Sequence, residues 1–297
     1  MKNKTGILFF CAMLIGAHSA AAGEKNIRLL ILNRHKPERL ELFPAEHTRL
    51  FLGSSLVTGK IEIDNLSGMI TIKNGTNTTK NRRSVSLASY GKGVWIFVKG
   101  SPKRLYQGNF EIKAEGRNLK IVNDLPLETY LVSVVSGEAS DLSEKEALRA
   151  QAVAARTYTL THLGRHKKDK SDLCDLTHCQ LYAGFENVNE DVRWAVDSTK
   201  GEVLTYKGKL ISSFYHSACG GKTESVVYVW PSRHEPYLTS VADGNAAHPY
   251  CASAPYFSWT SKIPLSKLQR AFMELGLLKP GEPIRKIKIS ELSPSGR

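Results

Sequence analysis

A single carboxylate, Glu138, stands where it could act as a proton donor. It follows an apolar run ending in Val134 and Val135 and precedes an alanine-rich stretch, within DLPLETYLVSVVSGEASDLSEKEALRAQAVAARTY, residues 124–158. A lone acid between two packed elements can be held in a cleft, and an apolar surround helps to keep such an acid protonated at neutral pH. The pattern therefore points to acid catalysis by Glu138.

Two predicted helices must position this acid. Pro126 suits the first turn of a short helix, and the apolar residues after it recur at helical spacing. Glu138 then falls at or just past the end of that helix. Ser143 and Glu146 form a capping box, which predicts a second helix from residue 144 to about residue 163.

The second helix carries Arg149 and Arg156, which are two turns apart and so share a face. An arginine on a largely apolar helix needs a partner, either a carboxylate or an anionic ligand. Both alternatives stay open for Arg156: a structural role that bridges buried groups, or a role in the chemistry.

The first residues have the pattern of an export signal. Lys2 and Lys4 precede a short apolar run, and Ala20–Ala22 supplies the small residues for cleavage, so residues 1–22 are predicted to be a signal peptide. The chain carries a net charge of +13. Removal of the signal, which contains two lysines and no acidic residue, would leave a mature charge of 13 − 2 = +11. An exported basic protein suits an anionic cell-wall polymer or a membrane surface rather than nucleic acid. No later stretch is long and apolar enough to cross a membrane.

Four cysteines follow the signal, and an even number in an exported protein predicts two disulfides. For Cys219 and Cys251 we expect a disulfide. For Cys174 and Cys179 a disulfide and a structural zinc site are equally supported, because His178 lies between them and His166 lies upstream. Four protein ligands would leave zinc no open position for water, so such a site would be structural.

Strands and helices are segregated along the chain, which favours an α+β fold. Residues 23–123 are strand-rich, and residues 124–297 form the second predicted region. Strands are expected at residues 26–33, 59–72, 93–98, 202–206, 210–215 and 285–289, a hairpin at 110–122, an exposed loop at 76–83, and further helices at 190–199 and 264–277.

The segment from residue 124 to residue 158 resembles the signature of the SpoIID / LytB family, which comprises stage II sporulation protein D, the amidase enhancer and their relatives. Further family motifs follow in the same order: CDLTHCQLYAG, then AVDSTKGEVLTYKGKLISSFYHSACGGKTES, then PYLTSVAD. Family members usually continue into a motif of the GHGxGxSQxGA kind, which is not found before Arg297. We therefore expect residues 124–297 to be a truncated SpoIID-like catalytic domain.

The resemblance implies a lytic transglycosylase, which cleaves the β-1,4 bond between N-acetylmuramic acid and N-acetylglucosamine in peptidoglycan and forms a 1,6-anhydro ring. It implies Glu138 as the catalytic acid and a functional role for Arg156. Lys222 could bind a muramic acid carboxylate, while Gln180, Tyr182 and, more weakly, Ser217 could contact the sugar. No cofactor is required for this chemistry.

The resemblance also implies zinc in some members, bound by cysteines and histidines near Cys174, His178 and Cys179. A second function is open as well: a protein without catalytic activity that binds peptidoglycan and stimulates a cell-wall amidase. Both functions place the protein outside the cytoplasm, in the periplasm or the extracellular cell-wall space. A third, weaker reading is a metallo-hydrolase that uses the cysteine–histidine cluster.

Overall fold

The computed structural model describes residues 25–139, 142, 144–245, 247–288 and 291–296. The predicted signal peptide and Ser143 of the predicted capping box lie outside these residues. Two compact units are present, the first ending at Phe214 and the second beginning at Tyr215. None of the helices in the described segments combines the length and the apolar character that crossing a membrane requires.

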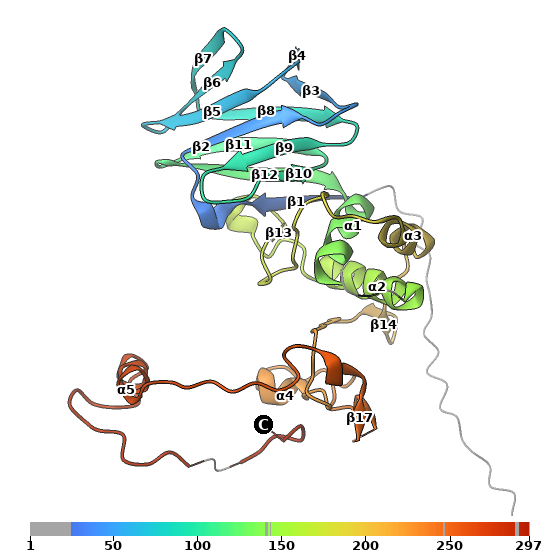
Figure 1. Cartoon of the computed structure of the whole chain (residues 1–297), viewed down its shortest axis with the longest axis vertical. Coiled ribbons are helices and arrows are strands. Elements are labelled where there is room, and N and C mark those ends of the chain that lie inside the picture. Colours follow the sequence, from blue (N-terminus) through green and yellow to red (C-terminus); the bar gives the residue numbers. More distant parts are fainter. Residues whose placement is uncertain (1–24, 140–141, 143, 246, 289–290, 297) are drawn as a thin grey trace, which may run out of the picture. The chain divides into compact units, whose positions relative to one another are not determined.

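Two antiparallel sheets make up most of the first unit (Figure 1). The larger sheet has the strand order β13 (Leu173–Cys174), β1 (Asn26–Ile31), β12 (Asn118–Pro126), β11 (Asn109–Glu115), β8 (Ser84–Tyr90), β3 (Arg49–Leu52) and β4 (Ser55–Val57), and only β13 pairs in parallel, with β1. The other sheet has the order β10 (Arg104–Tyr106), β9 (Val94–Val98), β2 (Arg39–Pro44), β5 (Ile61–Leu66), β6 (Met69–Asn74) and β7 (Asn77–Arg82).

Alternating apolar residues explain how these sheets form a core. In β5, Ile61 and Ile63 are buried while Glu62 and Asp64, which follow them, are partly exposed, and β2 and β9 show the same alternation. Side chains on successive residues of a strand point to opposite faces, so each sheet buries one face. The predicted hairpin at residues 110–122 is confirmed as β11 and β12.

Among the described residues, three α-helices complete the first unit, and together with the sheets they confirm the α+β class. They are α1 (Leu127–Glu138), α2 (Lys145–Thr161) and α3 (Glu190–Ser198), close to the predicted ranges, and they pack against one another. Because β12 runs directly into α1, which also contacts β1, the sheet sets the direction of the helix that carries Glu138. Short 3₁₀ helices η1 (Asn33–His35) and η2 (Lys167–Asp169) lie in the connections.

Three expectations differ from the structure. Residues 76–83, expected to be a loop, contain β7, because the turn at Asn74-Gly75 directs the chain back along β6 as an edge strand with every residue exposed. The strands expected at residues 202–206 and 210–215 are reduced to β14 (Thr205–Tyr206) and β15 (Lys209–Leu210). The predicted division at residues 123/124 also differs from the observed one, since β12 and α1 belong to one unit.

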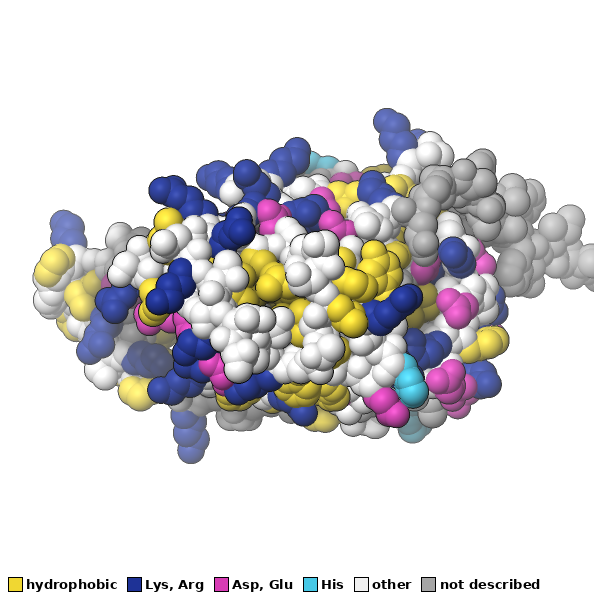
Figure 2. Space-filling view, turned by 90° about the horizontal axis from the view of Figure 1, so that it is seen from above, with side chains coloured by type: hydrophobic (Ala, Val, Ile, Leu, Met, Phe, Trp, Pro, Cys, Tyr) yellow, Lys and Arg dark blue, Asp and Glu magenta, His cyan; other side chains and the backbone are white. Residues whose placement is uncertain are grey.

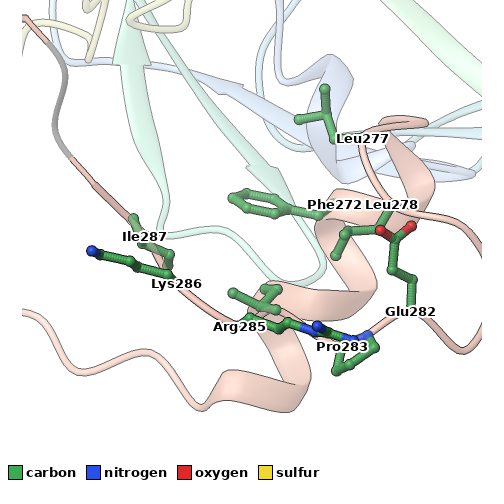
Figure 3. A pocket seen from close by; sticks show the side chains of 9 residues that line it. Phe272, Leu277, Leu278, Glu282, Pro283, Arg285, Lys286 and Ile287 are labelled. Atoms are coloured by element: carbon green, nitrogen blue, oxygen red, sulfur yellow. The ribbon is translucent and has the colours of Figure 1, made fainter.

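The second unit has little regular structure: α4 (Val226–Val229), β16 (Gly244–Asn245), β17 (His248–Pro249), the 3₁₀ helix η3 (Tyr250–Ser253) and α5 (Leu265–Glu274). Helix α5 confirms the helix expected at residues 264–277. The strand expected at residues 285–289 is wrong for its described part, because residues 285–288 are not paired in a sheet. Residues 285–287 instead line an open pocket of about 500 Å³ beside Phe272 of α5 (Figure 3).

Candidate active site and cysteine–histidine cluster

Glu138 is the last residue of α1, and its side chain is half-buried. The helix is anchored by a buried apolar face that includes Tyr130, Val134 and Val135. The carboxylate oxygen Oε1 accepts a hydrogen bond of 2.7 Å from the backbone N–H of Leu181. Within the described residues, the second oxygen, Oε2, has no hydrogen-bond partner. One oxygen of this acid is therefore held, and the other is available.

A segment that we call the strap, residues 180–184, runs along α1 and supplies the amide that holds Glu138. Ser133 fastens its far end, since its Oγ donates to the carbonyl of Gly184 at 2.7 Å and accepts from the N–H of Gly184 at 3.1 Å. At the near end, the Tyr130 hydroxyl donates to Gln180 Oε1 at 3.1 Å. These contacts attach the first and the last residue of the strap to α1.

Gly137 allows the strap to approach α1 closely. A Cβ atom at this position would lie 2.9 Å from the carbonyl oxygen of Leu181, closer than a carbon can approach without moving the backbone. The role of this glycine is therefore to allow a close approach of two backbone segments. The residue next to the candidate acid must be small for the Leu181 amide to reach that acid.

Gln180 and Tyr182, which the sequence placed in a sugar cleft, lie in the core. Gln180 accepts hydrogen bonds from Tyr130 and Thr159 and donates to the carbonyl of Ala155. The Tyr182 hydroxyl donates to Asn123 at 2.7 Å. Both side chains can be buried because these partners satisfy the hydrogen bonds of the amide and the phenol. Their placement does not support a sugar-contacting role; they anchor the strap instead.

Arg156 is almost completely buried, with 1% of its side chain exposed. Its guanidinium makes two parallel hydrogen bonds to Glu128 of α1, at 2.9 and 2.7 Å, and donates to the carbonyls of Glu202 and Val196. The partner expected for Arg156 is thus a carboxylate. Each nitrogen of the guanidinium donates to another group of the protein, as expected for a structural role. Arg156 links α2 to α1 and α3 and does not reach a surface from which it could touch a substrate.

The predicted metal ligands His166, Cys174, His178 and Cys179 come together, with all their ligand atoms within 4.8 Å of one another. Cys174 Sγ lies 3.4 Å from His178 Nδ1, and Cys179 Sγ lies 3.5 Å from both His178 Nδ1 and His166 Nε2. No disulfide joins the two sulfur atoms. A hydrogen bond from the Cys179 thiol lowers the pKa of Cys174 to about 4, while the same interaction raises the pKa of Cys179.

The remaining candidates belong to the second unit. Ser217 is exposed, and Lys222 is exposed and donates to the carbonyl of Pro294 at 2.7 Å. The sulfur atoms of Cys219 and Cys251 lie 3.5 Å apart, without a bond between them. The disulfide expected here is therefore not formed in this structure, although the two residues are neighbours as expected.

Three contributions were missed by sequence reasoning. Nothing in the sequence around Glu128 marked it as the partner of Arg156, although Arg156 was expected to need a carboxylate or an anionic ligand. The Leu181 amide is a backbone group, and no residue type reveals it. Asp243, which accepts hydrogen bonds from Cys219 Sγ and the N–H of Cys251, ends the PYLTSVAD motif, and the spacing of that motif from either cysteine gives no sign of the contact.

Comparison with known proteins adds independent information. Residues 115–206 match the model of the family described as SpoIID, stage II sporulation protein. Over this segment the chain belongs to the SpoIID family. The matched segment contains Glu138, the strap, Arg156 and the cysteine–histidine cluster.

Curated relatives agree with this assignment. An uncharacterized protein of Brachyspira hyodysenteriae is 37% identical over 164 residues, which is 55% of this chain and 43% of that protein. The amidase enhancer of Bacillus subtilis is 38% identical over 150 residues, 50% of this chain and 19% of the enhancer. Stage II sporulation protein D of Bacillus subtilis is 30% identical over 164 residues, 50% of this chain and 46% of that protein. The chain therefore spans less than half the length of these three relatives.

We predict that breaking the Arg156–Glu128 pair destabilises the first unit. Arg156→Ala leaves a buried carboxylate without its partner and should lower the free energy of unfolding by about 3–5 kcal/mol. Thermal and urea unfolding followed by circular dichroism measure this loss. Arg193→Ala is the control, because its contact with Glu190 is exposed and should contribute less than about 1 kcal/mol. Equal effects of the two substitutions would contradict the structural role of Arg156.

Proposed function

We propose that this chain acts on the bacterial cell wall as a peptidoglycan lytic transglycosylase in which Glu138 is the single catalytic acid. The observation that carries the proposal is the state of this carboxylate: half-buried at the end of α1, with Oε1 held by the Leu181 amide and Oε2 without a partner among the described residues. The family match and the names of the Bacillus relatives support a role at the cell wall.

The chemistry follows from the two oxygens of Glu138. Since Oε1 accepts the Leu181 N–H, the proton of the neutral acid resides on Oε2, which gives it to the glycosidic oxygen as the bond to C1 of N-acetylmuramic acid breaks. The resulting carboxylate takes the proton of the C6 hydroxyl of the same sugar, and the C6 oxygen bonds to C1. The acid is regenerated, a 1,6-anhydro ring is formed and no water is consumed.

A single acid is enough because the substrate supplies the nucleophile. Glycosidases that use water or a covalent intermediate generally need a second carboxylate at a defined separation. Glu128 lies ten residues before Glu138 on α1, about 15 Å away along the helix axis, and its carboxylate is bound by Arg156, so it does not serve as a second catalytic carboxylate. Lys222 and Ser217 stay predictions as substrate contacts.

Charge supports an anionic partner outside the cytoplasm. Lys and Arg side chains are spread over much of the face seen in Figure 2. Residues 65–110 contain eight basic residues and no Asp or Glu, and none of the eight forms an ion pair with a described residue. They are Lys73, Lys80, Arg82, Arg83, Lys92, Lys99, Lys103 and Arg104. Such a surface suits the negatively charged cell-wall matrix, in the periplasm or the extracellular space.

A second function rests on the similarity to the amidase enhancer of Bacillus subtilis. In this alternative the chain binds peptidoglycan and stimulates a cell-wall amidase without cutting glycan. The strap and α1 would then form a binding surface, and Glu138 would contact sugar without transferring a proton.

We also propose that His166, Cys174, His178 and Cys179 hold a structural zinc ion. Two thiols and two imidazoles are a typical zinc set, and ligands bonded at about 2.0–2.3 Å to one tetrahedral ion lie roughly 3.3–3.8 Å apart, as several of these atoms do. His166 Nδ1 also faces Asp169 at 3.6 Å, and a carboxylate behind a ligating histidine is a common supporting arrangement. Since Cys179 immediately precedes the strap, zinc would fix the near end of the strap.

Glu138→Gln should abolish the formation of 1,6-anhydro ends while the protein stays folded. Removing a general acid costs about 100-fold or more in rate, because glutamine has no proton to transfer. Purified glycan strands are digested and the products are weighed by mass spectrometry. Glu144→Gln is the matched control, since Glu144 is exposed at the start of α2 and should cut like the unaltered protein. Intact glycan with every variant, together with tight binding, would support the enhancer alternative.

Gly137→Ala should displace the strap from Glu138. The added methyl group meets the carbonyl of Leu181, so we expect a loss of about 1–3 kcal/mol in stability together with a lower cleavage rate. Thermal unfolding and the rate of anhydro-end formation are measured on the same samples. Gly59→Ala is the control, because a Cβ there meets no atom within 4 Å. Full cleavage by Gly137→Ala would show that the Leu181 contact is not needed.

The zinc proposal predicts that Cys174→Ser/Cys179→Ser loses one equivalent of zinc relative to the unaltered chain and unfolds at a lower temperature. Elemental analysis of the folded protein gives the metal content, and His234→Ala, an exposed histidine outside the cluster, should keep it. If Cys174 and Cys179 are recovered as a disulfide that resists alkylation until reduced, the zinc proposal is wrong. Activity that disappears on chelation in a protein that stays folded would instead favour the metallo-hydrolase.

A further inference from the structure

The second unit brings two thiols and a carboxylate together around one point. Cys219, Asp243 and Cys251 offer ligand atoms that all lie within 4.8 Å of one another. Cys219 Sγ is 3.5 Å from Cys251 Sγ and 3.3 Å from Asp243 Oδ2. These separations fit ligands that share one ion, since two thiolates bonded at about 2.3 Å to a tetrahedral ion lie roughly 3.7 Å apart.

Backbone contacts hold the three ligands in place. The N–H of Asp243 donates to the carbonyl of Gly221, two residues after Cys219, at 3.0 Å. The N–H of Cys251 donates to Asp243 Oδ2 at 3.0 Å, and the N–H of Tyr250 donates to the Asp243 carbonyl at 3.3 Å. Three separate stretches of chain therefore meet at the cluster with their backbones already connected.

A disulfide alone would not account for this arrangement. A bond between Cys219 and Cys251 needs only the two sulfur atoms, whereas here a carboxylate oxygen is directed at the thiol of Cys219 and at the backbone of Cys251. Cys251 and Asp243 are also partly exposed, so an ion could reach the cluster and a fourth position would be open.

The second unit needs such a connection. Among its described residues, the buried hydrophobic side chains are those of Cys219 and Val226, and α5 buries none of its own. A unit with so small a core cannot rely on apolar burial for stability, and small domains of this kind are usually held by metals or disulfides.

The geometry points to a second zinc site formed by Cys219, Asp243 and Cys251, separate from the cysteine–histidine cluster and independent of glycan cleavage. Two thiolates select zinc over hard cations such as calcium and magnesium. The ion would connect the segment of Cys219 to those of Asp243 and Cys251. With three protein ligands, it would keep one position for water or an exogenous group.

Zinc content separates this site from the cluster in the first unit. The full chain is purified with a reductant that contains no thiol, exposed to excess zinc, passed over a desalting column and analysed for metal per chain. We expect two equivalents in the unaltered protein, one in Cys174→Ser/Cys179→Ser and one in Cys219→Ser/Cys251→Ser. One equivalent in the unaltered protein that persists in Cys219→Ser/Cys251→Ser overturns the proposal.

Asp243→Asn tests the carboxylate while both thiols remain. It should weaken zinc binding in the Cys174→Ser/Cys179→Ser background by roughly tenfold or more, as a competing chromophoric chelator measures, and Asp197→Asn should not. Cobalt in place of zinc should give a thiolate charge-transfer band that is lost in Cys219→Ser/Cys251→Ser. Unchanged affinity in Asp243→Asn, or a Cys219–Cys251 disulfide in protein isolated from its native compartment, contradicts the site.

Discussion

The buried ion pair between Arg156 and Glu128 is the interaction on which the rest of the first unit depends. It joins α1 to α2 through two parallel hydrogen bonds, and the same guanidinium reaches the carbonyl of Val196 in α3 and that of Glu202 beyond it. Charges taken out of water are tolerated only when their hydrogen bonds are satisfied, so the three helices have few other relative positions open to them. The end of α1, where Glu138 lies, is set by this constraint.

The strap restricts the position of the Glu138 carboxylate directly, through the N–H of Leu181. It begins one residue after Cys179, is fastened by Tyr130 and Ser133, and passes so close to α1 that residue 137 must be glycine. The candidate acid and the cysteine–histidine cluster are therefore ends of one continuous structural path. If the proposed zinc ion is bound, it would affect the position of Glu138 through the strap without taking part in the proposed reaction.

Much of the local structure could be predicted from the sequence, because it depends on near neighbours. The end of α1 at Glu138, the range of α3 and the β11–β12 hairpin follow from helical spacing, alternation and turn residues. The clustering of Cys174, His178 and Cys179 follows equally from short spacing. His166 was included on proximity in sequence, and the fold brings its Nε2 to Cys179.

What the sequence could not show depends on groups that are distant or carry no residue-specific signal. Gln180 and Tyr182 look like sugar-binding residues by type, but Asn123 and Thr159, far away in sequence, supply the hydrogen-bond partners that allow them to be buried in the core. Residues 77–82 are polar enough to suggest a loop, yet an exposed edge strand with lysine and arginine has the same composition and resists pairing with other chains.

The pairing of β1 has a consequence for how the chain reaches its fold. Its neighbours are β12 and β13, and the contact of Arg28 with Asp172 joins residues 144 positions apart. During synthesis from the N-terminus, the apolar strand β1 is therefore made long before the two strands that pair with its edges, β12 and β13. Closing such long loops is slow, so we infer that assembly of this sheet is late and that shielding of β1 by a chaperone would raise the yield of folded protein.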